Sequence, residues 1–152
     1  MKKVLKTGKV VSTNISGKRG VRKLSVESIE IKVDHGIVED AHAGFDDVRQ
    51  ISMLAIESID KMRAKGLDVN PGDFAENITT EGIVLYELPV GTIMQAGDVE
   101  LQVTQIGKEC KDRCVIYYQA GDCVMPREGI FVRSLNPGVI RPEDEIKVYS
   151  EE

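Results

Sequence analysis

All three cysteines of this chain lie in one short window, residues 106–128, with the sequence IGKECKDRCVIYYQAGDCVMPRE. Cys110 directly precedes Lys111, and further cations stand close by. Cations beside a partly exposed thiol lower its pKa, and the resulting thiolate is both a nucleophile and a ligand for soft metals. Cys114 precedes the apolar Val115 and is typical of a buried, unreactive cysteine. Charge context alone leaves Cys110 open between a reactive thiolate and an inert core residue.

The spacing of the cysteines, C-x3-C-x8-C, differs from the C-x2-C pairs of zinc ribbons and of thioredoxin-like redox proteins. The chain has two histidines, His35 and His42, and both lie far upstream of the cysteine window. We therefore expect no zinc site. An odd number of cysteines also argues against a disulfide framework, which leaves thiol chemistry or plain burial.

The length and charge of the chain restrict the classes of partner. Its 152 residues are enough for one domain, residues 1–152, with its own core. The 20 Lys and Arg residues and 25 Asp and Glu residues give a net charge of −5, and both signs are interspersed. This pattern argues against a nucleic-acid or membrane partner. The first residues lack the apolar core of a signal peptide, so we expect a cytoplasmic protein.

Apolar and polar residues alternate in much of the chain, which favours strands that are buried on one face. Residues 9–15 and 28–33 show this alternation. The segment from Gly91 to Leu101 is weakly repeated from Gly138 to Val148, and each copy reads as a strand, a turn and a second strand. Such units suit the hairpins of a small barrel.

One segment has the period of a helix. Apolar and small residues recur every three or four positions from Ile51 to Met62, and Gly66 can end the helix in the left-handed conformation. A shorter helical piece is expected near residues 112–119. The sequence therefore predicts a β-rich α+β domain, a curved or closed sheet with one principal helix and short helical segments.

Five segments, taken in chain order, resemble the MOSC domains, which are named for the C-terminal domain of molybdenum-cofactor sulfurase. The similarity covers nearly the whole chain and is greatest to the short, stand-alone members of that family. It implies a barrel-like fold, a molybdopterin-type cofactor, and one cysteine that carries sulfur as a persulfide or binds molybdenum. The segments are GIVEDAHAG (36–44), RQIS (49–52), PGDFAENI (71–78), TQIGKEC (104–110) and CVMPREGIFVR (123–133).

The resemblance assigns roles to individual residues. Cys110 holds the place of the family's cysteine, as catalytic residue and as molybdenum ligand. His42, Arg49 and Asn77 hold the places of the family's histidine, of the arginine before the Gln-Ile-Ser strand, and of the asparagine of the G-E-N segment. All three are expected to contact the cofactor.

Two positions depart from the family pattern. Glu39 stands where the family usually has glycine before the aspartate, and Ala75 stands where glycine often precedes Glu-Asn. A side chain at either position could tighten or close a loop near the ligand.

A pyranopterin also presents a phosphate and the polar edges of a heterocycle. The loop SGKRG (16–20) offers glycines together with Lys18 and Arg19 for the phosphate, although exposed cationic loops are often simply solvated. Asp73 and Asn77 can make paired hydrogen bonds to a heterocycle edge. Alternatively, these two residues bond their own backbone in a turn after Pro71-Gly72.

Two arginines flank a predicted strand near the end of the chain. Arg127 and Arg133 stand on either side of residues 128–132, and Arg133 shares a face with Phe131 if the strand is regular. One of the two arginines is expected to face the ligand. His42 could instead be a helix-capping or core histidine, or could act as an acid near neutral pH.

These observations lead to one function and two alternatives. The first is a molybdenum-cofactor protein that binds or sulfurates the cofactor through Cys110, with cofactor biosynthesis proteins or a sulfur donor as partners. The second is a cofactor-dependent reductase of N-hydroxylated substrates. The third is an interaction module that binds no cofactor and in which the thiols are inert.

Overall fold

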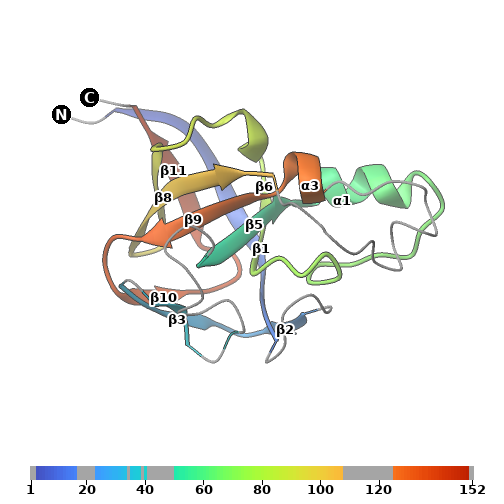
Figure 1. Cartoon of the computed structure of the whole chain (residues 1–152), viewed down its shortest axis with the longest axis horizontal. Coiled ribbons are helices and arrows are strands. Elements are labelled where there is room, and N and C mark those ends of the chain that lie inside the picture. The colour runs from blue at the N-terminus through green and yellow to red at the C-terminus, as the bar shows by residue number, and fades with distance from the viewer. Residues whose placement is uncertain are drawn as a thin grey trace.

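The computed structural model describes residues 3–16, 23–33, 35–38, 40, 50–107 and 125–150 (Figure 1). In this part of the chain, strands predominate over helices. The helical elements are α1 (Ile56–Arg63), the 3-10 turn η1 (Leu85–Glu87) and α3 (Met125–Glu128). The strands are β1 (Val4–Ile15), β2 (Leu24–Val26), β3 (Ile29–Lys32), β4 (Gly36–Ile37), β5 (Ile51–Ala55), β6 (Ile78–Glu81), β7 (Ile93–Ala96), β8 (Val99–Ile106), β9 (Ile130–Ser134), β10 (Gly138–Ile140) and β11 (Glu145–Tyr149).

Seven of the described strands close into a barrel in the order β11-β7-β8-β9-β5-β6-β1, because β1 pairs again with β11. The long strand β1 makes this closure possible, since its first half pairs with β11 and its second half with β6 and β2. A second sheet, β10-β3-β4, lies across one end of the barrel in Figure 1. The predicted β-rich barrel with one principal helix is confirmed.

The inside of the barrel is filled by aliphatic side chains that alternate along the strands. Strands β3, β8 and β11 bury every second residue, as a half-buried strand requires. Val10, Met53, Val132 and Ile146 belong to this core and are fully buried. A smaller cluster packs α1 onto the outside of β5 through Leu54.

The predicted helix from Ile51 to Met62 is wrong over its first five residues. Ile51–Ala55 is the strand β5, and the helix begins only at Ile56. Both faces of β5 are buried, because Met53 points into the barrel while Leu54 packs under α1. A strand that is covered on both sides shows no alternation, so its apolar run merged with the helical pattern that follows.

The internal repeat predicted two hairpins, and one of them forms. Strands β7 and β8 pair with each other, but β10 pairs with β3 in the second sheet and leaves β11 to the barrel. The expected helical piece near residues 112–119 lies outside the described residues. Among the described residues, no helix combines the length and the apolar character needed to cross a bilayer.

The turn that leads into β6 has an unusual backbone. Gly72 and Ala75 have φ angles of 92° and 64°, in the left-handed region. That conformation disfavours alanine by about 1–2 kcal/mol, which explains why a glycine would suit position 75 better. At Gly72 the backbone also passes close to a neighbour, since its carbonyl oxygen accepts a 2.7 Å hydrogen bond from Lys23 N.

We expect Gly72→Ala to lower the free energy of unfolding far more than Gly66→Ala. Both glycines have nearly the same φ, 92° and 91°. A Cβ at position 72 would lie 2.3 Å from Lys23 O, whereas one at position 66 would meet nothing within 4 Å. The left-handed φ costs each variant about 1 kcal/mol, and the overlap costs Gly72→Ala roughly 1–3 kcal/mol more. Urea denaturation measures both losses, and equal losses would contradict the close approach.

Candidate functional site

Four of the predicted site residues lie in the described part of the chain: Asp73, Asn77, Arg127 and Arg133. The others lie outside it, namely Lys18, Arg19, His42, Arg49 and Cys110, together with Cys114 and Cys123. Several described residues flank these positions in the sequence.

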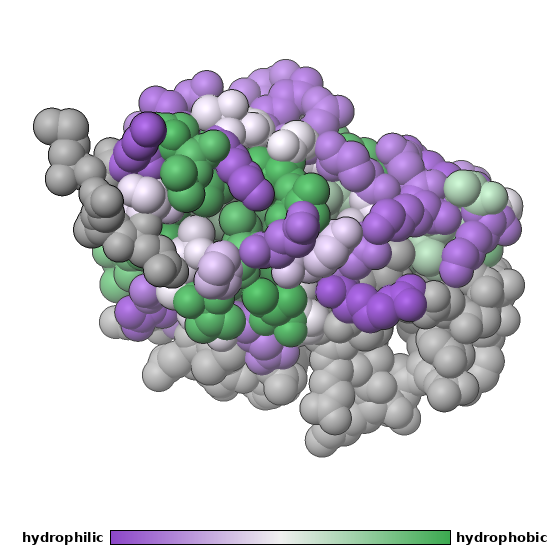
Figure 2. All heavy atoms as spheres, turned by 90° about the horizontal axis from the view of Figure 1, so that it is seen from above, coloured by the Kyte–Doolittle hydropathy of each residue, from purple (hydrophilic) through white to green (hydrophobic). Residues whose placement is uncertain are grey.

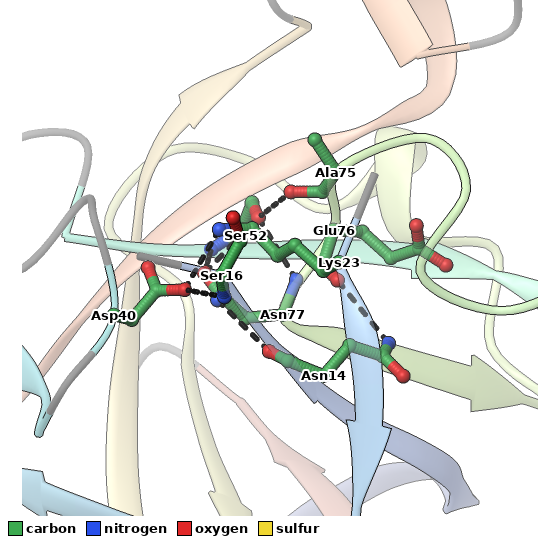
Figure 3. A network of polar contacts seen from close by, with 8 residues as sticks. All are labelled: Asn14, Ser16, Lys23, Asp40, Ser52, Ala75, Glu76 and Asn77. Carbon is green, nitrogen blue, oxygen red and sulfur yellow. Dashed lines mark hydrogen bonds and ion pairs between the residues drawn. The ribbon is translucent and has the colours of Figure 1, made fainter. Parts of the chain in front are cut away.

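A buried ion pair joins residues that border two predicted site segments. Asp40 Oδ1 accepts hydrogen bonds from Ser16 N at 3.1 Å and from Lys23 Nζ at 2.7 Å (Figure 3). The side chains of Lys23 and Asp40 are both 0% exposed. Ser16 and Lys23 flank residues 17–22, and Asp40 immediately precedes residues 41–49. The described residues that border these segments therefore meet at one point.

Asn77 cross-links three strands beside this ion pair. Its Oδ1 accepts from Ser52 N at 3.0 Å, and its Nδ2 donates to Asn14 O at 3.2 Å. These contacts tie the start of β6 to β5 and β1, and Asn77 is fully buried. The structure thus gives Asn77 a structural role, and its contact with a cofactor stays a prediction.

Glu76 is a second buried carboxylate in the same network, and sequence analysis gave it no role. Its two oxygens accept hydrogen bonds from Gly72 N at 3.0 Å, Phe74 N at 3.2 Å and Thr79 Oγ1 at 2.8 Å. Burial raises the pKa of Glu76 above its ordinary value, although these hydrogen bonds oppose the shift. The lack of a clear period in residues 74–78 was the only sequence signal of such a network.

Asp73 takes part in the turn itself, where its Oδ2 accepts a hydrogen bond from Asn70 N at 2.9 Å. This contact matches the turn alternative raised for Asp73, and its contact with a heterocycle stays a prediction.

Arg133 lies on the outer face of the barrel, on the same side as Ser52. Ile130 and Val132 point into the core, so Phe131 and Arg133 point outward. Phe131 pairs with Ser52 on β5, and Arg133 Nε donates to Gln102 Oε1 at 2.9 Å. Arg133 is half-buried there, a suitable setting for a cation that meets an anionic ligand group.

The segment that contains Cys110 leaves the barrel close to this face. Gln105 on β8 pairs with Phe131, so Gln105, Phe131 and Ser52 form one row across three strands. Such a row spans roughly 10 Å between its outer strands. Two residues beyond the row, Gly107 N donates to Gly129 O at 2.6 Å. The described residues before and after the cysteine window therefore lie close together, beside the outer face of β5 that carries Ser52.

Arg127 is exposed on α3, and its neighbour Glu128 fastens α3 to α1. Glu128 Oε1 accepts from Ser58 Oγ at 2.6 Å, and Lys61 Nζ lies 2.9 Å from Oε2. This hydrogen bond raises the pKa of Lys61. The ammonium group also lies 5.5 Å from the centre of the Tyr86 ring. The contacts fix the point at which the chain returns from the cysteine window.

Gln50 has an acceptor with no protein partner. Its side chain is 1% exposed, and among the described residues its Oε1 has no hydrogen-bond donor. Gln50 lies between Arg49 and the strand β5, next to the buried network. An orphaned acceptor and a half-buried guanidinium on one face fit a ligand with N–H donors and an anionic group.

The described residues contain no cluster of three His, Cys, Asp or Glu side chains that could hold a metal ion. A soft molybdenum centre calls for a thiolate, and all three cysteines lie outside the described residues.

An apolar hollow of about 300 Å³ lies at the other end of β1 and is a weaker candidate. Figure 2 shows apolar side chains on the face that carries the two termini. Lys6 is the one charged group among the described lining residues, so this hollow offers few partners to a polar heterocycle. It is lined by Leu5, Lys6, Leu88, Pro89, Thr92, Val148 and Tyr149.

Comparisons with known proteins agree with this architecture. The family model described as the MOSC domain matches residues 40–147. The YUAD protein from Bacillus subtilis shares 20% identity and has a TM-score of 0.77, with 100% of each chain covered. YiiM from Geobacillus stearothermophilus shares 20% identity with a TM-score of 0.70, over 93% of this chain and 74% of that one. YiiM from Escherichia coli shares 17% identity with a TM-score of 0.65, over 97% and 71%. These likenesses show the fold, and no curated protein matches the sequence.

We expect the single variants Asp40→Leu and Lys23→Met each to lower the free energy of unfolding by about 3–5 kcal/mol, because each removes one charge of a buried ion pair and leaves the other in place. The double variant should lose much less than the sum of the single losses, since neither charge remains. Chemical denaturation of the four proteins measures the coupling. Additive losses would show that the 2.7 Å contact is not the reason for the effect.

The unfolding free energy should depend on pH through Glu76. Because its pKa is raised in the fold, the carboxyl group stabilises the fold most below its unfolded pKa of about 4.3. This contribution is lost as pH rises through the folded pKa. The unfolding free energy of the natural protein minus that of the Glu76→Gln variant should therefore decrease as the pH rises from about 4 to the folded pKa. Urea denaturation of both proteins over this range measures the difference, and a rising difference would contradict the raised pKa.

Proposed function

Because the chain belongs to the MOSC domain family, we propose that it binds a molybdopterin-type cofactor and handles sulfur or molybdenum through the thiolate of Cys110. The observation that carries the proposal is a buried anchor, Asp40, which lies at the borders of two segments predicted to bind the cofactor. It accepts hydrogen bonds at 3.1 and 2.7 Å from the residues on either side of segment 17–22. A buried anchor of this kind holds binding residues without leaving them to a loop alone.

Residues of different types are proposed to bind different parts of the cofactor. Lys18, Arg19 and Arg49 are the cations proposed for its phosphate, and Arg133 is proposed to serve the same anionic part from β9. Asn77 would meet the heterocycle edge, and its bonds to Ser52 and Asn14 hold β5 and β1 to the start of β6. When bound, the cofactor supplies a molybdenum atom held by dithiolene sulfurs.

Cys110 is proposed to act as the nucleophile and soft ligand. Lys108, Lys111 and Arg113 surround it in the sequence, and cations beside a thiol favour its thiolate form. In the sulfur-carrier role, its thiolate attacks the terminal sulfur of a persulfide donor. A new S–S bond forms on Cys110, the S–S bond of the donor breaks, and the thiolate of the donor leaves. Cys110 then holds one additional sulfur atom.

We expect Cys110→Ser, purified from a host that makes the cofactor, to lose bound molybdenum or cyanide-labile sulfur by at least about tenfold, because a hydroxyl is a poor soft ligand and carries no sulfur. Cys114→Ser is the matched control and should keep both. Elemental analysis and cyanolysis measure the two contents. Unchanged contents in Cys110→Ser would rule out the role of this thiol.

The same preparations separate the two alternative functions. A natural protein without molybdenum, tungsten or fluorescent pterin would favour an interaction module with inert thiols. A loaded protein that accepts electrons from a reduced donor and reduces an N-hydroxylated base would favour the reductase.

A further inference from the structure

The orphaned acceptor of Gln50 lies at the start of β5, close in register to Arg133 on β9. Ile51 points into the barrel core, so alternation places Gln50 and Ser52 on the outer face. Ile51 pairs with Val132 and Ser52 with Phe131. Continuing this register by one residue sets Gln50 opposite Arg133, where neighbouring Cβ atoms lie about 5 Å apart.

Arg133 does not satisfy this acceptor, although it is the nearest cation along the register. Its Nε donates to Gln102 Oε1 at 2.9 Å, away from β5. An amide oxygen that is 1% exposed and unpaired destabilises the fold. A leucine or methionine would avoid that cost, so the amide calls for another explanation.

Thr80 provides a contrast within the same barrel. Its Oγ1 is the second buried atom without a partner among the described residues. Thr80 pairs with Val10 and Ala55, which both belong to the aliphatic core inside the barrel. The described side chains around this hydroxyl are aliphatic and suit no polar ligand. Among the described residues, only Gln50 combines an unpaired acceptor with the outer face.

We propose that Gln50 Oε1 accepts a hydrogen bond from a ring N–H or amino group of the bound pterin heterocycle. The inference rests on the proposed function, because it names a contact of the same cofactor. The acceptor fits the donor edge of a pterin, while Arg133 beside it suits the anionic part. Gln50 would thus fix the orientation of the heterocycle, a role that sequence analysis did not assign to it.

The test replaces each orphaned group by an apolar group of similar volume. Gln50→Met and Thr80→Val are produced in a host that makes the cofactor and in one that lacks it. Without cofactor, both variants should melt at or above the temperature of the natural protein, because each loses an unpaired buried polar group. With cofactor, Gln50→Met should contain at least about tenfold less fluorescent pterin per chain, and Thr80→Val should contain as much as the natural protein.

Each other outcome overturns the inference in a distinguishable way. A lower melting temperature of cofactor-free Gln50→Met would show that the amide has protein partners. Unchanged pterin in Gln50→Met, with pterin present in the natural protein, would remove Gln50 from the binding site and leave the proposed function intact. A natural protein that contains no pterin would overturn the proposed function, and the inference with it.

Discussion

The buried contact between Lys23 and Asp40 is the constraint on which the arrangement of the candidate site depends. Removing two charges from water is costly, and a pair such as this one seldom adds net stability over an apolar pair. Its 2.7 Å geometry and the additional bond from Ser16 N make it highly directional, however. Aliphatic side chains could fill the same volume without fixing which segments meet. The main effect of the Lys23–Asp40 pair is therefore to fix which segments of the chain lie next to each other.

The barrel separates this positioning network from its core. Inside the barrel, aliphatic side chains from every strand pack together, and this packing needs no particular partner for any one residue. Outside β5, by contrast, Asn14, Ser52, Glu76 and Asn77 satisfy one another through directional hydrogen bonds. The chain thus uses burial to form the barrel and polar contacts to hold the turn at Gly72 against Lys23.

The sequence predicted the features that depend on local pattern. Alternation revealed β1, β3 and the β7–β8 hairpin, since each has one polar face. It failed at Ile51–Ala55 because both faces of that strand are covered. The Lys23–Asp40 pair was beyond reach for a different reason. Its partners are 17 residues apart, and neither differs in sequence from an ordinary surface charge. Resemblance marked the segment around Asp40 but did not reveal what Asp40 holds.

Most of the unfavourable features of the described structure lie close together, although Glu143 between β10 and β11 also has a left-handed φ, of 77°. Ala75 occupies a left-handed conformation, Glu76 is a carboxylate removed from water, and Gln50 has an unpaired acceptor. Ala75 and Glu76 belong to the same hydrogen-bond network as Ser52, and Gln50 lies two residues before Ser52 in the chain. In the barrel interior, by contrast, the hydroxyl of Thr80 is the only such feature among the described residues. Strain and unpaired polar groups persist where the surrounding structure fixes them, and they gather at functional sites. Their concentration on one face of β5 is therefore an argument for the location of the site that does not depend on the family match.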